Sequence, residues 1–379
     1  KNAYSSIIDA NLTTLLTGLI LLFLGKGPIS GFAIILVIGI LTSLFCSIFL
    51  TRLIFEWMLK TEQNIKFGSE STMKAFQGFN WNFIGKRKVA YIISGIVIVA
   101  GMVSLMTRGL NLSVDFEGGR SYIVAYESNE DIVPVRDALT AKFGSAPEVK
   151  TFGGDNKHKI TTKYRIEDKS ETVDTEVEEV LKSGLDEVVG AGAYEIEKSQ
   201  KSGPTFARDI KEAAIKSIVI GLIAIFIYVV VRFRKWQYGL GALLALSHDV
   251  LFVLGLFSLF WGVLPFNLEV DQAFIAAILT VVGYSINDTV VVFDRIRESL
   301  TLHTKAPLKE TINGALNKTV SRTFITSLTT LFVILILFIF GGEILRGFSF
   351  ALLVGVLVGT YSSLFIATPV VVDFDKSGR

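Results

Sequence analysis

Eight long apolar stretches constrain this chain of 379 residues more than any other feature. A bilayer core of about 30 Å is spanned by about 20 residues of α-helix, and each stretch meets or approaches that length. The stretches are continuous rather than alternating, which favours helices over a membrane barrel. We therefore expect an α-helical polytopic membrane protein with transmembrane helices near residues 7–24, 31–51, 89–106, 212–231, 238–261, 272–292, 323–340 and 346–370.

The charged residues indicate how these helices are oriented. Lys and Arg collect in the segments 52–88, 232–235 and 295–318, which the positive-inside rule places in the cytoplasm. The segment 109–206 carries 12 Lys and Arg against 19 Asp and Glu, a net charge of −7. Since it follows the third apolar stretch, we expect it to form a water-exposed domain on the extracytoplasmic side.

The pattern within 109–206 predicts a small α+β domain. Alternating apolar residues indicate strands, and apolar residues on one face at a spacing of three and four indicate helices. The resulting order βαββαβ is typical of a ferredoxin-like fold. The predicted elements are a strand at 121–126, a helix at 131–143, strands at 148–152 and 159–166, a helix at 173–189 and a strand at 194–198.

The first and last apolar helix pairs are related by an internal repeat with an offset of 316 residues. Because both pairs run in the same direction, a pseudo-two-fold axis along the membrane normal is expected, with a transport pathway at the repeat interface. The residues that recur are Thr13, Thr14, Gly25, Gly31, Phe32, Gly39, Ser47 and Phe49, which match Thr329, Thr330, Gly341, Gly347, Phe348, Gly355, Ser363 and Phe365.

Charged residues inside lipid-spanning helices are costly, so each is expected to face a partner, water or a pathway. Asp288 lies about 10 Å of helix inside the cytoplasmic boundary, and Arg322 lies about 6 Å inside it. At similar depth on adjacent antiparallel helices, the two are candidates for an acid–base pair that binds and releases a proton. The alternative is a static ion pair, or two side chains that reach back to the cytoplasm.

Three further intramembrane residues have plainer explanations. His248 and Asp249 are adjacent, so at most one can face the Asp288 pair, and an interhelical hydrogen bond is the favoured alternative for either. Asp9 stands at the start of the first span, where a helix N-cap is an equally good explanation.

Other chemistries find little support in this sequence. A single cysteine, Cys46, and three histidines rule out a disulfide framework and a cysteine-rich metal site. Gly118 and Gly119 lack the context of a phosphate-binding loop, and the basic segment 295–318 is typical of a membrane flank rather than a nucleic-acid surface. We therefore expect a protein that is not an enzyme and that carries no cofactor or metal.

Several motifs resemble the SecD/SecF family. The run Gly283-Tyr-Ser-Ile-Asn-Asp-Thr-Val-Val-Val-Phe-Asp-Arg-Ile-Arg-Glu298 followed by Ser321-Arg322-Thr323 resembles the SecF signature, and Asp115-Phe-Glu-Gly-Gly119 resembles the motif that opens the SecF extracytoplasmic domain. Asp9-Ala-Asn-Leu-Thr-Thr14 resembles the end of SecD. The resemblance implies a C-terminal piece of a fused SecDF chain, belonging to the resistance-nodulation-division superfamily. Its parts would be a SecD-like helix pair at 1–51, a cytoplasmic linker at 52–88, the first SecF-like helix at 89–108, the outer domain at 109–206 and a five-helix region at 207–379.

The resemblance also implies a function. It is that of an accessory motor of bacterial protein export in the cytoplasmic membrane, driven by protons or sodium ions, with residues 109–206 in the periplasm. Its partners would be the SecYEG translocon, YidC and YajC as further candidates, an unfolded preprotein and the lipid bilayer, without nucleic acid. Asp288 and Arg322 match the family's essential carboxylate and arginine, Asp9 matches an acid of the SecD half, and Asn287, His248 and Asp249 are supporting polar residues.

The chain departs from the family pattern at its beginning. The family's other proton-path aspartate and the large SecD outer domain would precede residue 1, so we do not expect this piece to complete a transport cycle alone. Two other functions stay open at this point, a small-molecule exporter of the same superfamily and a scaffold for Sec subunits that transports nothing.

Overall fold

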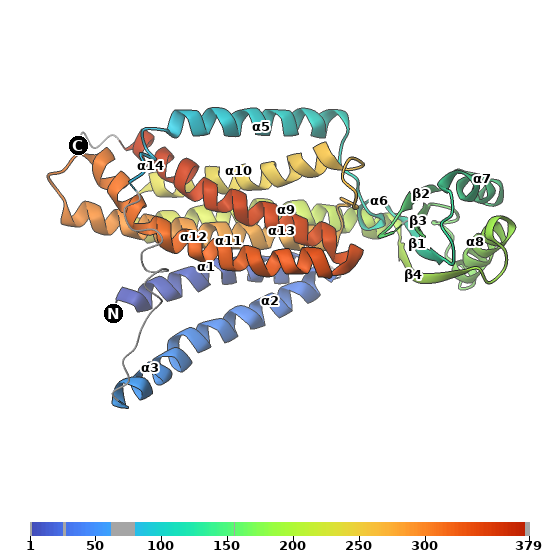
Figure 1. The fold of residues 1–379 in the computed structure, drawn as a ribbon, viewed down its shortest axis with the longest axis horizontal. Coiled ribbons are helices and arrows are strands. Elements are labelled where there is room, and N and C mark those ends of the chain that lie inside the picture. Colours follow the sequence, from blue (N-terminus) through green and yellow to red (C-terminus); the bar gives the residue numbers. More distant parts are fainter. Residues whose placement is uncertain (1, 26–27, 62–79, 155, 376–379) are drawn as a thin grey trace.

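The computed structural model describes residues 2–25, 28–61, 80–154 and 156–375. Long helices lie side by side in one body, and a small α+β domain projects from one end of it (Figure 1). The predicted division into a helical membrane part and a separate outer domain is confirmed.

Seven helices within these ranges are long and apolar enough to cross a bilayer, and the shorter apolar part of α1, Asn11–Leu24, makes an eighth. Two of the spans are continued by a π-helix and a further helix. The elements are α1 (Asn2–Leu24), α2 (Pro28–Phe45) with η1 (Cys46–Leu50) and α3 (Thr51–Lys60), α5 (Arg87–Thr107), α9 (Pro204–Phe233), α10 (Trp236–Phe260), α11 (Gln272–Leu302), α12 (Leu308–Phe340), and α13 (Gly342–Ser362) with η2 (Ser363–Ala367) and α14 (Thr368–Phe374).

Several helices are longer than their apolar stretches. The predicted span 272–292 belongs to α11, which ends at Leu302, and the predicted span 323–340 belongs to α12, which begins at Leu308. Apolar length marks only the part of a helix that lipid surrounds, whereas an amphipathic extension continues beyond it as long as one face stays packed. Ile312 and Leu316, both fully buried, supply that face in the extension of α12.

The internal repeat extends to the backbone. Both halves carry a π-helix, η1 and η2, whose positions differ by one residue from the offset of the repeat. In each half the threonine that follows the π-helix donates its hydroxyl to the carbonyl five residues earlier, from Thr51 at 3.0 Å and from Thr368 at 3.1 Å. Phe32 contacts its own repeat partner Phe348 edge to face at 6.4 Å between ring centroids. Equivalent residues touch only near a symmetry axis, so the pseudo-two-fold axis passes close to the outer ends of α2 and α13.

Helix α11 forms the centre of the bundle, and small residues let other helices pack closely around it. Most residues from Gln272 to Phe293 are buried. On the far side of α10, Gly101 of α5 meets Gly255 so closely that a Cβ atom on Gly101 would lie 2.8 Å from the Gly255 Cα. Such close crossings are the usual way in which membrane helices associate.

The outer domain has the predicted ferredoxin-like fold. Its elements follow the order β1 (Gly119–Tyr126), α7 (Ile132–Phe143), β2 (Glu148–Thr151), β3 (Lys157–Thr162), α8 (Val173–Val189) and β4 (Tyr194–Ser202). The four strands form one antiparallel sheet in the order β2-β3-β1-β4. The apolar face of the sheet packs on α7 and α8 around a core of its own that includes Tyr122, Val124 and Leu181.

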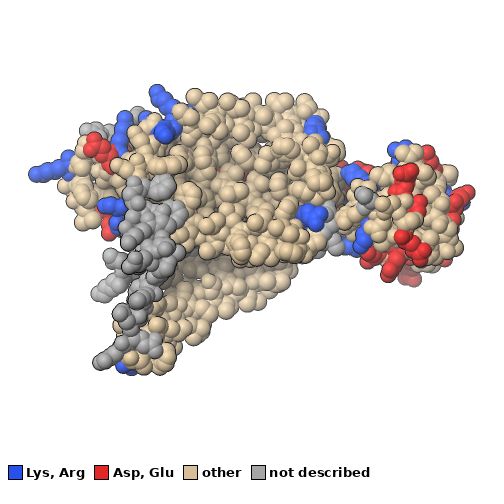
Figure 2. All heavy atoms as spheres, in the orientation of Figure 1, with Lys and Arg blue, Asp and Glu red and all other residues tan. Residues whose placement is uncertain are grey.

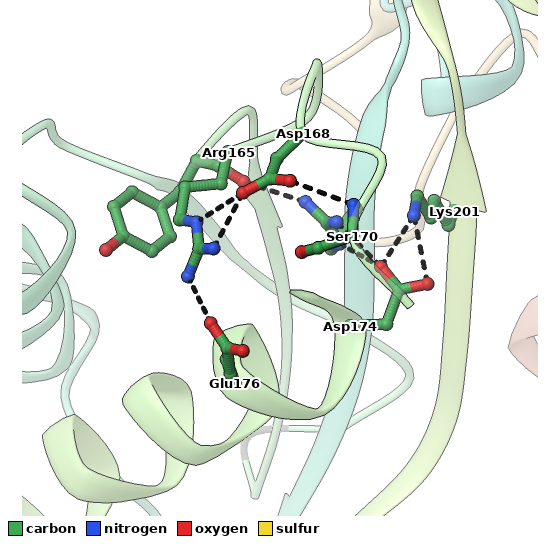
Figure 3. A network of polar contacts seen from close by, with 8 residues as sticks. Arg165, Asp168, Ser170, Asp174, Glu176 and Lys201 are labelled. Carbon is green, nitrogen blue, oxygen red and sulfur yellow. Dashed lines mark hydrogen bonds and ion pairs between the residues drawn. The ribbon is translucent and has the colours of Figure 1, made fainter. Parts of the chain in front are cut away.

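Two arginines hold the loop that connects β3 to α8. Arg120 on β1 is only 2% exposed and donates to Asp174 in the first turn of α8, at 2.6 Å and 3.0 Å. Arg165 donates to Asp168 and to Glu176, each at 2.6 Å (Figure 3). The ionic network therefore joins the loop, the helix and the central strand of the sheet.

The distribution of charge agrees with a membrane orientation. On the face drawn in Figure 2, Asp and Glu gather on the outer domain, and Lys and Arg lie mainly toward the two ends of the helical body. The middle of that face is almost free of charged side chains (Figure 2). This uncharged belt is where a bilayer is expected to surround the protein.

Candidate functional site

Asp288 lies in the middle of α11, and 9% of its surface is exposed. Among the described residues its one hydrogen-bond contact is long, at 3.5 Å from the hydroxyl of Ser327 on α12. That hydroxyl is also 2.6 Å from the Thr360 hydroxyl on α13 and receives a bond from Tyr284 at 3.4 Å. Asp288 is therefore a buried carboxyl group at the junction of three helices, with few donors to stabilise a negative charge.

Arg322 lies on α12, five residues before Ser327, and its side chain is exposed on the surface of the bundle. It is near enough to Asp288 for an electrostatic interaction. The two side chains, both of which the structure describes, form no direct ion pair. The structure thus brings the predicted pair into the same region but leaves them apart, with the Arg322 guanidinium accessible from outside the bundle.

A second buried acid, Asp249 on α10, is fully enclosed and well satisfied. Its Oδ2 atom accepts hydrogen bonds from Ser285 of α11 at 2.6 Å and from Ser362 of α13 at 2.8 Å. Its Oδ1 atom is 3.0 Å from Nδ1 of His248, which is 5% exposed. The interhelical hydrogen bonds named above as an alternative for Asp249 are therefore present.

Asn287 faces away from Asp288. With Asn11 and Thr14 of α1 and Ser43 of α2, it lines a cavity of about 420 Å³ between α1, α2 and α11. The Oδ1 atom of Asn287 is buried and has no partner among the described residues. Asp9 lies in α1, and its side chain falls outside the described part of the structure.

The hydroxyl groups around the two acids were missed by the sequence analysis. Ser285, Ser327, Thr360 and Ser362 are all buried, and each contacts Asp249, Asp288 or another of these hydroxyls. Ser285 precedes Asp288 by three residues, a spacing that places two helical residues on one face. That spacing is a usable signal, whereas the residues on α12 and α13 become neighbours only through packing.

The outer end of α11 is attached directly to the outer domain. Val270 and the segment before the domain form a short parallel bridge, in which Ser113 donates to Val270 at 3.0 Å and Val270 donates to Asn111 at 2.8 Å. Lys159 of β3 forms an ion pair with Glu269 in the same loop. A displacement of α11 would therefore also shift the residues of the outer domain to which the helix is attached.

Two glycines at the start of β1 allow the chain to turn sharply into the sheet of the outer domain. Gly118 has a φ of 76° and Gly119 a φ of 142°, which are conformations that residues with a side chain rarely adopt. A Cβ atom on Gly118 would also lie 3.2 Å from the Cα of Pro204, where α9 begins. The glycine pair therefore lets the chain turn from the short helix α6 (Val114–Glu117) into the sheet beside α9.

Comparison with known proteins bears on the same motifs. The family described as protein export membrane protein SecD/SecF, C-terminal, matches residues 2–61 and 181–377. The SecD/SecF GG motif matches residues 103–130, which include the glycine pair. The chain belongs to the SecD/SecF family.

Individual relatives show which part of a SecDF protein the chain represents. The protein translocase subunit SecF of Rhodothermus marinus is 48% identical over 301 residues, which cover 79% of this chain and 95% of that protein. The SecDF subunit of Thermus thermophilus is 34% identical over 380 residues, 98% of this chain but 48% of that protein. The crystal structure of SecDF from Thermus thermophilus matches with a TM-score of 0.81 at 31% identity, over 97% of this chain and 48% of that chain.

The chain therefore spans nearly the whole length of this SecF relative and about half the length of the SecDF relatives. As a member of this family it is a polytopic protein of the bacterial inner membrane that serves in protein export. Because the chain belongs to this family, the family of its relatives favours protein export over the alternative of a small-molecule exporter.

Proposed function

We propose that this chain is the part of an accessory subunit of the Sec translocase in which a proton is bound and released to drive a step of preprotein export. Asp288 is the proton-binding group, and Arg322 is the cation that responds to its charge. The observation that carries the proposal is the environment of Asp288, a buried carboxyl group with one long hydrogen bond and a guanidinium nearby that does not pair with it.

The charge on Asp288 can bias the packing of the helices around it. An ionised Asp288 attracts Arg322 and favours stronger hydrogen bonds from Ser327, whereas a protonated Asp288 releases both. The ion shifts the equilibrium only by its different affinity for the two arrangements. A proton that crosses 100 mV supplies about 2.3 kcal/mol, so a large mechanical step requires several protons or an added pH gradient.

The output of this step is proposed to pass through the outer domain. α11 carries Asp288 in the membrane and is tied at its outer end to β3 through Glu269 and Lys159. We propose that the domain acts on an unfolded preprotein emerging from SecYEG, with YidC and YajC as further partners and with sodium as an alternative coupling ion. We propose that a SecD part, of the kind that makes up the rest of the SecDF relatives, completes the cycle.

The deciding experiment follows export in inverted membrane vesicles after ATP is exhausted, with a proton gradient imposed. We expect Asp288→Asn, assembled with the rest of the translocase, to lower the gradient-driven rate at least about tenfold, because its amide cannot take up a proton. Asp294→Asn is the matched control on the same helix, since Asp294 pairs with Arg297 at the cytoplasmic end.

The outcomes of this experiment separate the proposal from a scaffold function. A scaffold tolerates Asp288→Asn and Arg322→Gln alike and exports at the rate of the unaltered protein. Export by Asp288→Asn at that rate would refute the proton mechanism. If a sodium gradient but not a proton gradient supports export by the unaltered protein, sodium is the coupling ion.

A further inference from the structure

The pair His248 and Asp249 is not used by the mechanism above, yet it is among the most completely buried polar groups of the chain. Asp249 accepts from two hydroxyls, Ser285 and Ser362, and lies against Nδ1 of His248. Two hydroxyl donors and an imidazole nitrogen at hydrogen-bond distance therefore surround this carboxyl group. Among the described residues Asp288, by contrast, has a single long contact.

The hydrogen-bond pattern also determines the state of the imidazole. When Asp249 is ionised it can only accept, and the proton between the two groups then belongs to Nδ1 of His248. In the neutral ring Nε2 is then a bare lone pair, and this atom is buried without a partner among the described residues. This lone pair can therefore accept one proton inside the bundle.

The net charge of the pair favours protonation of Nε2 of His248. With a neutral imidazole, the pair leaves one negative charge buried between α10, α11 and α13, and burying an uncompensated charge is costly. A proton on Nε2 converts the pair into an imidazolium and a carboxylate with no net charge. We propose that His248 and Asp249 form a second proton-binding site, in which Nε2 of His248 takes up and gives back the proton while Asp249 stays ionised.

The groups that face this site from each neighbouring element are mostly hydroxyls and aromatic rings. The rings of Phe252 on α10 and Tyr361 on α13 each lie 5.9 Å from the imidazole. The Tyr361 hydroxyl bonds to Ser94 of α5 at 3.0 Å and donates to the Ala90 carbonyl at 3.0 Å. α11 contributes Ser285, with Asp288 one turn further on as the nearest charged group on that helix.

The second site shares two helices with the first, and this part of the inference rests on the proposed function. Ser285 and Asp288 are three residues apart on α11, and Thr360 and Ser362 are two residues apart on α13. A shift of α11 against α13 that follows a change of charge at Asp288 alters the bonds from Ser285 and Ser362 to Asp249. By linkage, a proton at either site then changes the affinity of the other.

The titration of His248 can be measured without any export assay. The chain has three histidines, His158, His248 and His303, so the imidazole signals of ¹⁵N-histidine protein in lipid nanodiscs can be assigned with single His→Gln variants. We expect a population of His248 with its proton on Nδ1 and a second population in which Nε2 also carries a proton, exchanging as the pH is changed. In Asp249→Asn the imidazolium population should be smaller than in the unaltered protein, because the buried carboxylate that balances its charge is gone.

A His248 signal that stays a single neutral tautomer at every pH at which the protein remains folded would overturn the proposal, and so would an imidazolium population that Asp249→Asn leaves unchanged. These readouts stand whether or not export is driven by protons. They therefore distinguish a failure of this inference from a failure of the proposed function.

Export measured as above tests the role of the site in transport. His248→Gln keeps a polar side chain but cannot carry the proton, and we expect gradient-driven export to fall at least about tenfold. Ser258→Ala is the control, since it removes an interhelical bond of 2.8 Å to Ser104 from the same helix without removing a titratable group. If His248→Gln exports normally while Asp288→Asn does not, the second site has no part in transport.

Discussion

Asp271 stands at the outer boundary of the membrane, where a single side chain both ends a loop and begins a helix. Its Oδ1 atom accepts from the Phe274 amide at 2.8 Å and caps the first turn of α11. Burial raises the pKa of the Asp271 carboxyl group to about 6, and the negative charges of Glu269 and Asp115 add to this effect. The ionised Asp271 carboxylate thus stabilises the first turn of α11, but its burial near two other carboxylates is unfavourable.

The substitution Asp271→Asn separates these two effects. Since the folded protein binds this proton more tightly than the unfolded chain, stability falls as pH rises from about 4 to about 6, and the cost persists above that range. Asparagine caps equally well without the charge, so we expect the free energy of unfolding to rise by about 3 kcal/mol at pH 7.5 and to be unchanged near pH 4. Thermal unfolding in detergent at the two pH values measures this. Asp271→Ala, which loses the cap, should be less stable than Asp271→Asn at both, and a stabilisation that does not depend on pH would contradict the assignment.

At the scale of elements, the segment that leads into α5 is held by α12. The segment around Trp81 donates its amide to Asn317 at 2.8 Å, and the Trp81 carbonyl accepts from Asn317 and Asn313, each at 2.9 Å. Phe83 is buried and contacts Phe365 of η2 at 5.2 Å between ring centroids. Two amide side chains one turn apart on α12 therefore bind the backbone of a segment that the sequence indicated only as a linker.

Removal of these amides should release the segment. Asn313 also accepts from the Ile84 amide, at 3.3 Å. We expect Asn313→Ala combined with Asn317→Ala to speed hydrogen exchange at the Trp81 and Ile84 amides at least about tenfold, since each lost hydrogen bond is worth about 1 kcal/mol. Thr311→Ala on the same helix is the control, because the Thr311 hydroxyl bonds to the Pro307 carbonyl and to no other group among the described residues. Unchanged exchange in the double variant would show that the apolar contacts of Phe83 alone hold the segment.

At the scale of the whole molecule, the outer domain packs around a hydrophobic core of its own, apart from the core of the helical body. Its core holds His158 on β3, which is fully buried beside Tyr126. Burial lowers the pKa of the His158 imidazole, and the nearby Glu130 opposes this in part. The folded domain therefore keeps His158 neutral, whereas the unfolded domain protonates it below pH of about 6.5.

As the pH is lowered, protonation of His158 in the unfolded state should thus destabilise the domain at a higher pH than the loss of its ion pairs does. As pH falls below about 6.5, the free energy of unfolding should decrease by up to about 1.4 kcal/mol per pH unit, measured from the slowest-exchanging amides of β1. Asp168, whose pKa is lowered to about 2 by bonds from Ser170 and Arg165, contributes only at more acidic pH. In His158→Gln the dependence between pH 6.5 and about 5 should disappear. If it persists, another group is responsible.

The sequence alone determined the number of spans, their orientation, the βαββαβ order of the outer domain and the internal repeat. Each of these depends on local properties, namely apolar length, the sign of charge at the helix ends and the period of apolar residues. The two buried acids Asp249 and Asp288 were also recognisable, because a charged residue within an apolar stretch stands out whatever surrounds it.

Only the tertiary structure decided what these acids touch. Ser327 and Thr360 come near Asp288, and Ser362 near Asp249, because α12 and α13 adopt a particular rotation and depth against α11. Apolar length does not specify either quantity, since lipid accepts any apolar face of a helix equally well. For the same reason the separation of Arg322 from Asp288 was set by the packing of helices rather than by any motif.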